Sequence, residues 1–109
     1  MGPIGETFDR EPTREEVDRL AGPVVLEFGA SWCGYCHALA PRLARMLRDY
    51  PAVRHVKIED GPGRPLGRSF RVQLWPSLVF IKDGAVRAQV ARPEDDEVRD
   101  GLEAISREG

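Results

Sequence analysis

The sequence is poor in cysteine and in aromatic residues, and neither sign of charge dominates it. Its 109 residues include two cysteines and 7% aromatic side chains, with a formal net charge of −2. Two cysteines cannot form a disulfide framework, and nucleic-acid binding usually needs a basic surface. No apolar run approaches the roughly 18 residues of a transmembrane helix, and the polar segment 1–16 does not resemble a signal peptide. We therefore expect no nucleic-acid or membrane partner and a cytoplasmic location, or a periplasmic one if a signal has been removed.

What remains is the composition of one ordinary globular domain. Hydrophobic residues make up 41% of the chain and charged residues 31%, which suits a domain with its own core. A chain of this length has room for one such domain and not for two. Segment 1–12 shows no periodicity, so we expect an N-terminal arm over 1–12 and a monomeric domain over 13–109.

Hydrophobic periodicity and turn residues predict alternating helices and strands. Thr13 and Glu16 match a capping box at the start of a helix, which the Gly-Pro pair at 22–23 stops. Segment 82–84 (KDG) predicts a tight turn between two antiparallel strands. Strands are expected over 24–28, 53–59, 77–81 and 85–91, further helices over 33–49, about 68–72 and 94–106, and a loop over 60–67. This order predicts an α/β fold, with a partly parallel sheet flanked by helices and a closing antiparallel hairpin.

The two cysteines, Cys33 and Cys36, lie together at the predicted junction between a strand and a helix. A helix N-terminus stabilises a thiolate through its free amides and its dipole, and the thiolate is the species that attacks disulfides. With two residues between them, both sulfurs can face one another across one turn, so a disulfide can close and reopen. We expect Cys33 to be exposed and to attack a substrate disulfide, and Cys36 to be more buried and to resolve the mixed disulfide.

Three other interpretations fit a Cys-x-x-Cys pair. A structural zinc site needs four ligands, and the only histidines are His37, expected on the helix surface, and His55, expected to be structural. The string Cys-x-x-Cys-His also matches the attachment signature of c-type haem, but Met46 is a poor axial ligand because it falls on the same predicted helix. Two inert, buried cysteines are the third interpretation. We expect no metal ion and no organic cofactor.

Several segments, in register with one another, resemble the thioredoxin family. Residues 28–36 (FGASWCGYC) are similar to its active-site segment, and Pro41 falls where the family has a proline inside the following helix. Residues 75–77 (WPS) look like its loop with a cis-proline opposite the dithiol, and residues 80–84 (FIKDG) resemble its hairpin turn. The resemblance spans about residues 13–109 and implies a thioredoxin fold, with a central mixed sheet flanked by helices.

The resemblance also implies roles for residues near the dithiol. Glu27 occupies the position of a buried acid behind the second cysteine, and burial disfavours its charged form, so it can accept a proton from Cys36. Lys57 matches a lysine near that acid; a plain Glu27–Lys57 ion pair is the alternative. A cis-Pro76 would present backbone groups to an extended substrate strand. The residues expected to bind substrate are Trp32, Gly34, Tyr35, Trp75, Pro76 and Arg92.

The residues between the cysteines depart from the family pattern. Gly34-Tyr35 stands where Gly-Pro is usual, and together with the histidine after Cys36 it is similar to some periplasmic disulfide isomerases. Such residues tune the redox poise of the pair. The resemblance implies an enzyme that reduces protein disulfides and is regenerated by a reductase or a small thiol. An isomerase or oxidase of exported proteins, and a binding or assembly factor without thiol chemistry, are the alternatives.

Overall fold

The computed structural model describes residues 11–107, in which helices alternate with strands up to two consecutive strands and a last helix. The helices are α1 (Arg14–Asp18), α2 (Gly34–Leu47), α3 (Pro65–Ser69) and α4 (Asp95–Ser106), and the strands are β1 (Pro23–Gly29), β2 (Arg54–Glu59), β3 (Ser77–Lys82) and β4 (Ala85–Ala91). Most of the arm predicted over 1–12 lies outside the described residues. No helix in this part of the chain is long and apolar enough to cross a membrane.

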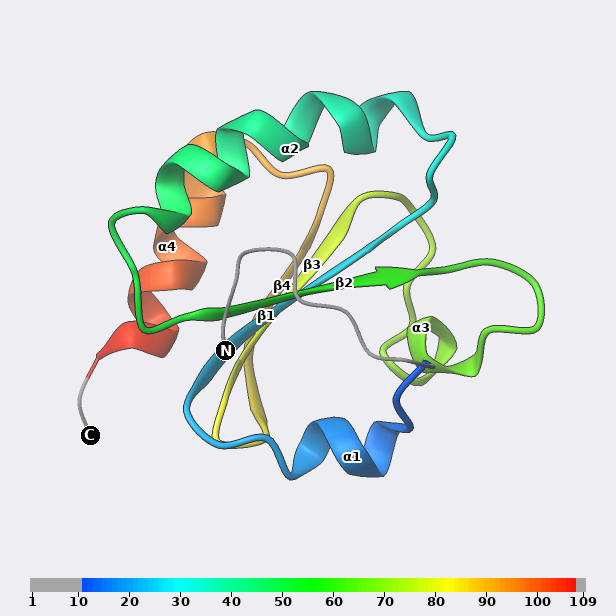
Figure 1. The fold of residues 1–109 in the computed structure, drawn as a ribbon, viewed down its shortest axis with the longest axis horizontal. Coiled ribbons are helices and arrows are strands. Elements are labelled where there is room, and N and C mark those ends of the chain that lie inside the picture. Colours follow the sequence, from blue (N-terminus) through cyan, green and yellow to red (C-terminus); the bar gives the residue numbers. More distant parts are fainter. Residues whose placement is uncertain (1–10, 108–109) are drawn as a thin grey trace.

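The strands form one mixed sheet in the order β2-β1-β3-β4. β1 pairs in parallel with β2 and antiparallel with β3, and β3 and β4 form an antiparallel hairpin. Figure 1 shows the sheet between two helical layers, with α2 and α4 on one face and α1 and α3 on the other. The predicted mixed sheet with a C-terminal antiparallel hairpin is therefore confirmed.

Strand β1 lies inside the sheet and contributes to the core on both faces. Successive strand residues point to opposite faces, so Leu26 and Phe28 pack with the cluster under α1 and α3, whereas Val25 packs with the cluster under α2 and α4. Burial on both faces explains why the strand is apolar almost throughout. The same alternation places Glu27 on the face of Val25, and the acid therefore lies under the helix that carries the dithiol.

The turn between β3 and β4 has the geometry that its sequence predicts. Asp83 and Gly84 both have positive φ, 50° and 82°, which is the combination that a type I′ turn requires. Gly84 also packs against the end of α1, where a Cβ would collide with the carbonyl oxygen of Asp18. Glycine at this position therefore serves both the turn and the close approach of the helix.

The short helix α3 begins earlier than predicted. A helix was expected around 68–72 after a loop over 60–67, whereas α3 spans Pro65–Ser69. Proline suits the first helical turn, because its φ is already helical and its missing N–H would have had no partner there. The chain then turns at Arg71, whose φ is +59°, so the expected end of the helix at Val72 is wrong.

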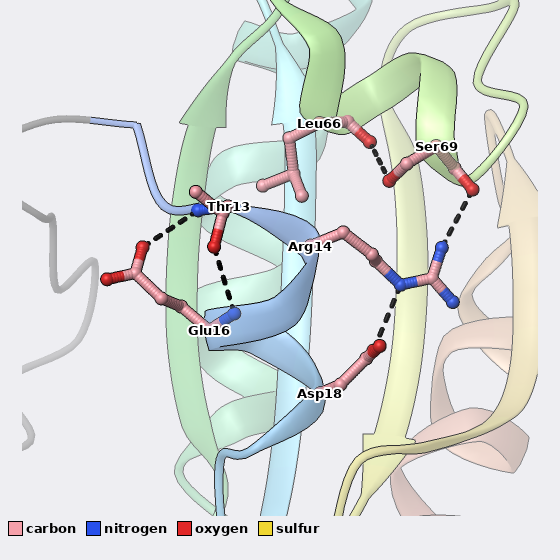
Figure 2. Close-up of polar contacts among 6 residues, drawn as sticks. All are labelled: Thr13, Arg14, Glu16, Asp18, Leu66 and Ser69. Atoms are coloured by element: carbon pink, nitrogen blue, oxygen red, sulfur yellow. Dashed lines mark hydrogen bonds and ion pairs between the residues drawn. The ribbon is translucent and has the colours of Figure 1, made fainter.

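Polar contacts fix helix α1 at its start and join it to α3 (Figure 2). The Thr13 hydroxyl accepts the N–H of Glu16 at 3.0 Å, and the Glu16 carboxylate accepts the N–H of Thr13 at 2.8 Å. This is the predicted capping box. Arg14 donates to Asp18 at 3.0 Å and to the carbonyl oxygen of Ser69 at 2.7 Å, and it thereby connects the two short helices on this face of the sheet.

Candidate active site

The two cysteines lie together at the start of α2. Cys33 is the N-cap residue, Cys36 lies in the first turn, and both are free thiols. The prediction that Cys33 would be exposed and Cys36 more buried is wrong, because their exposed fractions are 7% and 8%. Ala30 and Trp75 pack with the pair, and this packing accounts for the burial of Cys33.

The start of the helix places the sulfur of Cys33 where a negative charge is favoured. Its Sγ accepts the N–H of Cys36 at 3.2 Å, which is the bond that an N-cap side chain makes. The sulfur also lies at the positive end of the α2 dipole, and both effects stabilise a thiolate relative to a thiol. This geometry suits Cys33 to attack a disulfide.

The surroundings of Cys36 keep its thiol protonated. Burial raises the pKa of the Cys36 thiol most, followed by its hydrogen bond with Cys33, and the charges of Cys33 and Glu27 act in the same direction. A backbone hydrogen bond with Ala30 acts against them, and the resulting pKa moves from 9.0 to about 11. At neutral pH, Cys36 must therefore lose a proton before it can act as a nucleophile.

A cavity behind Cys36 contains the buried acid. Its volume is about 570 Å³, and its lining includes Glu27, Cys36 and Lys57. Glu27 is 5% exposed, and its Oε1 lies 2.6 Å from Nε2 of His55, which is 7% exposed. The alternative ion pair between Glu27 and Lys57 is not formed among the described residues. Lys57 is exposed, because the long lysine side chain can keep its ammonium group in water.

His55 is a site residue that sequence reasoning missed, since only a structural role was expected for it. One signal was available. Side chains alternate along a strand, so His55 and Lys57 share one face of β2, and in the parallel register they lie beside Val25 and Glu27 of β1. A buried acid needs a donor, and a histidine on the same face of the neighbouring strand can supply one.

The loop before β3 lies against the dithiol. The Trp75–Pro76 peptide bond is cis, which confirms the conformation expected for Pro76. The indole N–H of Trp75 donates to Asp60 at 2.9 Å, a contact that no sequence pattern indicated. The Trp75 ring meets the 74% exposed ring of Trp32 edge-on, with centroids 5.4 Å apart. The two indoles form an apolar part of the rim around the cysteines.

Arg92 and Tyr35 form another part of this rim. The guanidinium carbon of Arg92 lies 4.0 Å from the ring centroid of Tyr35, which is 60% exposed. Arg92 also donates through Nε to the carbonyl oxygen of Trp75 at 2.9 Å and through its backbone N–H to that of Pro76 at 2.8 Å. A hollow of about 550 Å³ is lined in part by Tyr35, Pro76 and Arg92. The structure therefore brings these predicted substrate-binding residues together beside Gly34.

His37, which follows the second cysteine, lies on the surface of α2 as predicted. Its Nε2 lies 2.7 Å from the carbonyl oxygen of Ser31, the distance of a hydrogen bond from ring to backbone. Within residues 11–107, no group of three or more histidine, cysteine, aspartate or glutamate side chains is arranged to hold a metal ion.

Known proteins are similar to this chain in sequence and in fold. A model of the thioredoxin family matches residues 6–104. A rice (Oryza sativa subsp. indica) H-type thioredoxin is 30% identical over 98 residues, which cover 89% of this chain and 78% of that protein. Thioredoxin Asp f 28 of Aspergillus fumigatus is 34% identical over 64 residues, 59% of either chain. The structure of reduced thioredoxin 2 from Pseudomonas aeruginosa PAO1 matches with a TM-score of 0.79 and 48% identity over 97% of each chain.

A Cys-x-x-Cys pair at a strand–helix junction, beside a cis-proline in a mixed sheet flanked by helices, defines a protein-disulfide oxidoreductase. The chain belongs to the thioredoxin family. Cys33 and Cys36 fit the dithiol motif through which that family carries out thiol–disulfide exchange.

Proposed function

We propose that this protein reduces disulfides of other proteins, with Cys33 as the attacking sulfur and Cys36 as the resolving sulfur. The observation that carries this assignment is the asymmetry of the pair. The Cys33 sulfur accepts an amide hydrogen at the start of α2, whereas burial and its neighbours raise the pKa of the Cys36 thiol to about 11. One sulfur is set to react as a thiolate, and the other waits as a thiol.

The reaction takes two displacement steps. The Cys33 thiolate attacks a substrate disulfide, so a Cys33–substrate disulfide forms and the other substrate sulfur leaves as a thiolate. Cys36 then gives its proton to Glu27 and attacks Cys33, which closes the Cys33–Cys36 disulfide and releases the second substrate sulfur. Lys57, in the lining of the same cavity, supplies a positive charge near that acid. Two electrons have then passed to the substrate, and a disulfide reductase or a small thiol must restore them.

An extended segment of the substrate would lie along the loop that holds Trp75 and Pro76, in the manner of an added β-strand. The exposed rings of Trp32 and Tyr35 offer apolar contact on either side of the dithiol motif. The carbonyl oxygen of Trp75 already accepts the Nε–H of Arg92. A substrate amide must therefore share or replace this bond, so Arg92 controls access to the edge that pairs with the substrate.

The alternatives have less support. The relatives compared above are named thioredoxins, and a factor that only binds would have no use for a resolving cysteine beside a buried acid. We place the protein in the cytoplasm, where thiols are kept reduced, and expect it to act as a monomer without a bound cofactor. The equilibrium potential of the pair against glutathione distinguishes a reductant from an isomerase or oxidase, because an oxidising value would contradict the reductase.

Single-cysteine variants test the two-step mechanism. Cys36→Ser is expected to react once with a disulfide-bonded protein such as insulin and then to remain attached to it, because no resolving sulfur is left. Non-reducing electrophoresis and mass spectrometry measure the trapped adduct. Catalytic reduction of insulin should fall to background.

Cys33→Ser is the matched control, because it removes the other sulfur and keeps the same hydroxyl replacement. It is expected to lose turnover without trapping the substrate. Equal trapping through Cys36 would reverse the two roles. Full turnover by either variant would exclude a dithiol mechanism.

A further inference from the structure

We propose that His55 is a positioning residue that holds Glu27 as a charged carboxylate, ready to take the proton of Cys36. The inference rests on the proposed function, since it concerns the step in which Cys36 resolves the mixed disulfide. His55 lies outside the segments that carry the family resemblance, and its role follows from its contacts.

The His55–Glu27 pair is short and buried. Nε2 of His55 lies 2.6 Å from Oε1 of Glu27, and the two residues are 7% and 5% exposed. The side chains project from the same face of β1 and β2, two strands paired in parallel within the sheet. Both residues therefore lie on paired strands and not on loops, and these rigid elements hold the ring against the carboxylate.

The second ring nitrogen indicates where the proton lies. Nδ1 of His55 is buried and has no hydrogen-bond partner among the described residues. A buried N–H without an acceptor is rare and costly, whereas an acceptor without a donor is tolerated more easily. The ring therefore carries its proton on Nε2 and donates it to Glu27 as a neutral imidazole. Such a donor stabilises the charged carboxylate and adds no charge of its own.

Few other polar groups lie close enough to influence the Glu27 carboxylate. Lys57 lines the cavity with Glu27 but is exposed, so water and salt screen its charge. The remainder of this face is an apolar cluster between the sheet and helices α2 and α4. Tyr50 lies at the edge of this cluster, and its hydroxyl donates to Glu103 of α4 at 2.9 Å. The titratable or charged groups on this side of the sheet near the pair are Cys33, Cys36, His37, Lys57, Glu59, Tyr50 and Glu103.

During resolution, the proton of the Cys36 thiol moves to the carboxylate of Glu27 while Nε2–H of His55 stays bonded to Oε1. The Cys36 sulfur then forms its bond to Cys33, and the bond between Cys33 and the substrate breaks. His55 neither gains nor loses a proton. Without it, the buried carboxylate would lose its donor, and burial would favour the protonated acid, which cannot accept the proton.

Reaction of the reduced protein, in excess, with a limiting amount of Ellman's reagent, an aromatic disulfide, separates the two steps. Attack by Cys33 releases one thionitrobenzoate, and attack by Cys36 on the mixed disulfide releases the second. Stopped-flow absorbance follows both phases across a range of pH. In His55→Leu, the first phase is expected to stay unchanged. The second phase is expected to slow roughly tenfold at neutral pH. The increase of its rate with pH should move to higher pH by about one unit, as expected for the loss of one hydrogen bond to a charged group.

Two further variants test whether loss of the side-chain N–H of His55 causes the slower second phase. His55→Gln keeps a side-chain N–H and is expected to return the second phase toward the profile of the unmodified protein. In a Glu27→Gln background, His55→Leu is expected to cause no additional slowing, because the acceptor is already gone. Circular dichroism and thermal unfolding establish that each variant folds.

Nitrogen NMR of the unmodified protein tests the proton position without any substitution. A neutral ring protonated on Nε2 is expected at neutral pH, and a ring protonated on Nδ1 or on both nitrogens would overturn the proposal. An unchanged second phase in folded His55→Leu would overturn it as well. Failure of the proposed function has a different signature, because the unmodified protein in excess would then release only one thionitrobenzoate for each molecule of reagent and would form no Cys33–Cys36 disulfide.

Discussion

At the scale of single residues, local environment separates two identical thiols. Cys33 and Cys36 are almost equally buried, at 7% and 8% exposed, so exposure does not distinguish them. The sulfur of Cys33 accepts an amide hydrogen at the helix start, whereas Cys36 lies near the negative charge of Glu27. Burial contributes most to the raised pKa of the Cys36 thiol, and its hydrogen bond with Cys33 and the charge of Glu27 add to it. Cys36 therefore keeps its proton, whereas the sulfur of Cys33 faces the amides of the helix start.

The raised pKa of Cys36 makes the stability of the reduced protein depend on pH in the alkaline range. The pKa rises from 9.0 to about 11 on folding, so the folded state holds this proton more tightly. The contribution is complete below about pH 9 and is lost as pH rises through about 11. Urea unfolding of the reduced protein is therefore expected to show a falling free energy of unfolding across this interval.

Cys36→Ser provides the comparison, because it lacks the titrating thiol and should show a shallower fall. Tyr50 also has a raised pKa, caused first by its hydrogen bond to Glu103, but it is present in both proteins and its contribution cancels. Equal slopes in the two proteins would show that folding does not perturb Cys36.

At the scale of elements, the sequence predicts those features that neighbours in the chain determine. The capping box at Thr13 and the turn at Asp83 depend on residues within a few positions, and both were predicted. The start of α3 was not, because Pro65 is compatible with a loop as well as with a first helical turn. The mixed sheet followed from the alternation of helices and strands, which limits the ways in which strands can be connected.

At the active site too, the sequence predicts local motifs but not contacts between distant segments. The dithiol and the cis-Pro76 loop were predicted because short motifs carry them. Burial of Cys33 was missed because Trp75 covers it from a distant segment. The contact of His55 with Glu27 depends on the register of β1 against β2, and hydrophobic patterning specifies which face is buried without naming the partner across the strands.

Helix α4 supplies a prediction at this scale, because it approaches β3 at a glycine. Alanine is normally favoured over glycine inside a helix by about 1 kcal/mol. A Cβ at Gly101, however, would collide with the ring of the fully buried Phe80. Gly101→Ala is therefore expected to lower the free energy of unfolding by about 1–3 kcal/mol, as overpacking does, measured by urea denaturation.

Gly34→Ala is the matched control in α2, because a Cβ there meets nothing within 4 Å. It is expected to leave stability unchanged or slightly higher. A gain in stability from Gly101→Ala would mean that α4 does not pack so closely on the sheet.

At the scale of the whole molecule, the redox pair lies apart from the core that holds the fold together. The two large apolar clusters, one on each face of the sheet, contain no cysteine. Cys33 and Cys36 belong to a small third cluster with Ala30 and Trp75. A disulfide across two residues closes a very short loop, so it restricts the unfolded chain little. The domain can therefore carry the pair in either redox state.

This separation predicts that removing the dithiol abolishes chemistry and spares the fold. In Cys33→Ser/Cys36→Ala, serine still provides an N-cap acceptor, and the variant should unfold within about 1–2 kcal/mol of the reduced parent. Phe80→Ala, which empties a buried position between β3 and α4, should lose about 3–5 kcal/mol yet still reduce insulin at temperatures where it is folded. Urea denaturation and the insulin assay on the same samples measure both effects. Were the cysteine variant as unstable as Phe80→Ala, the dithiol would be part of the structural core, and each redox cycle would change the stability of the fold.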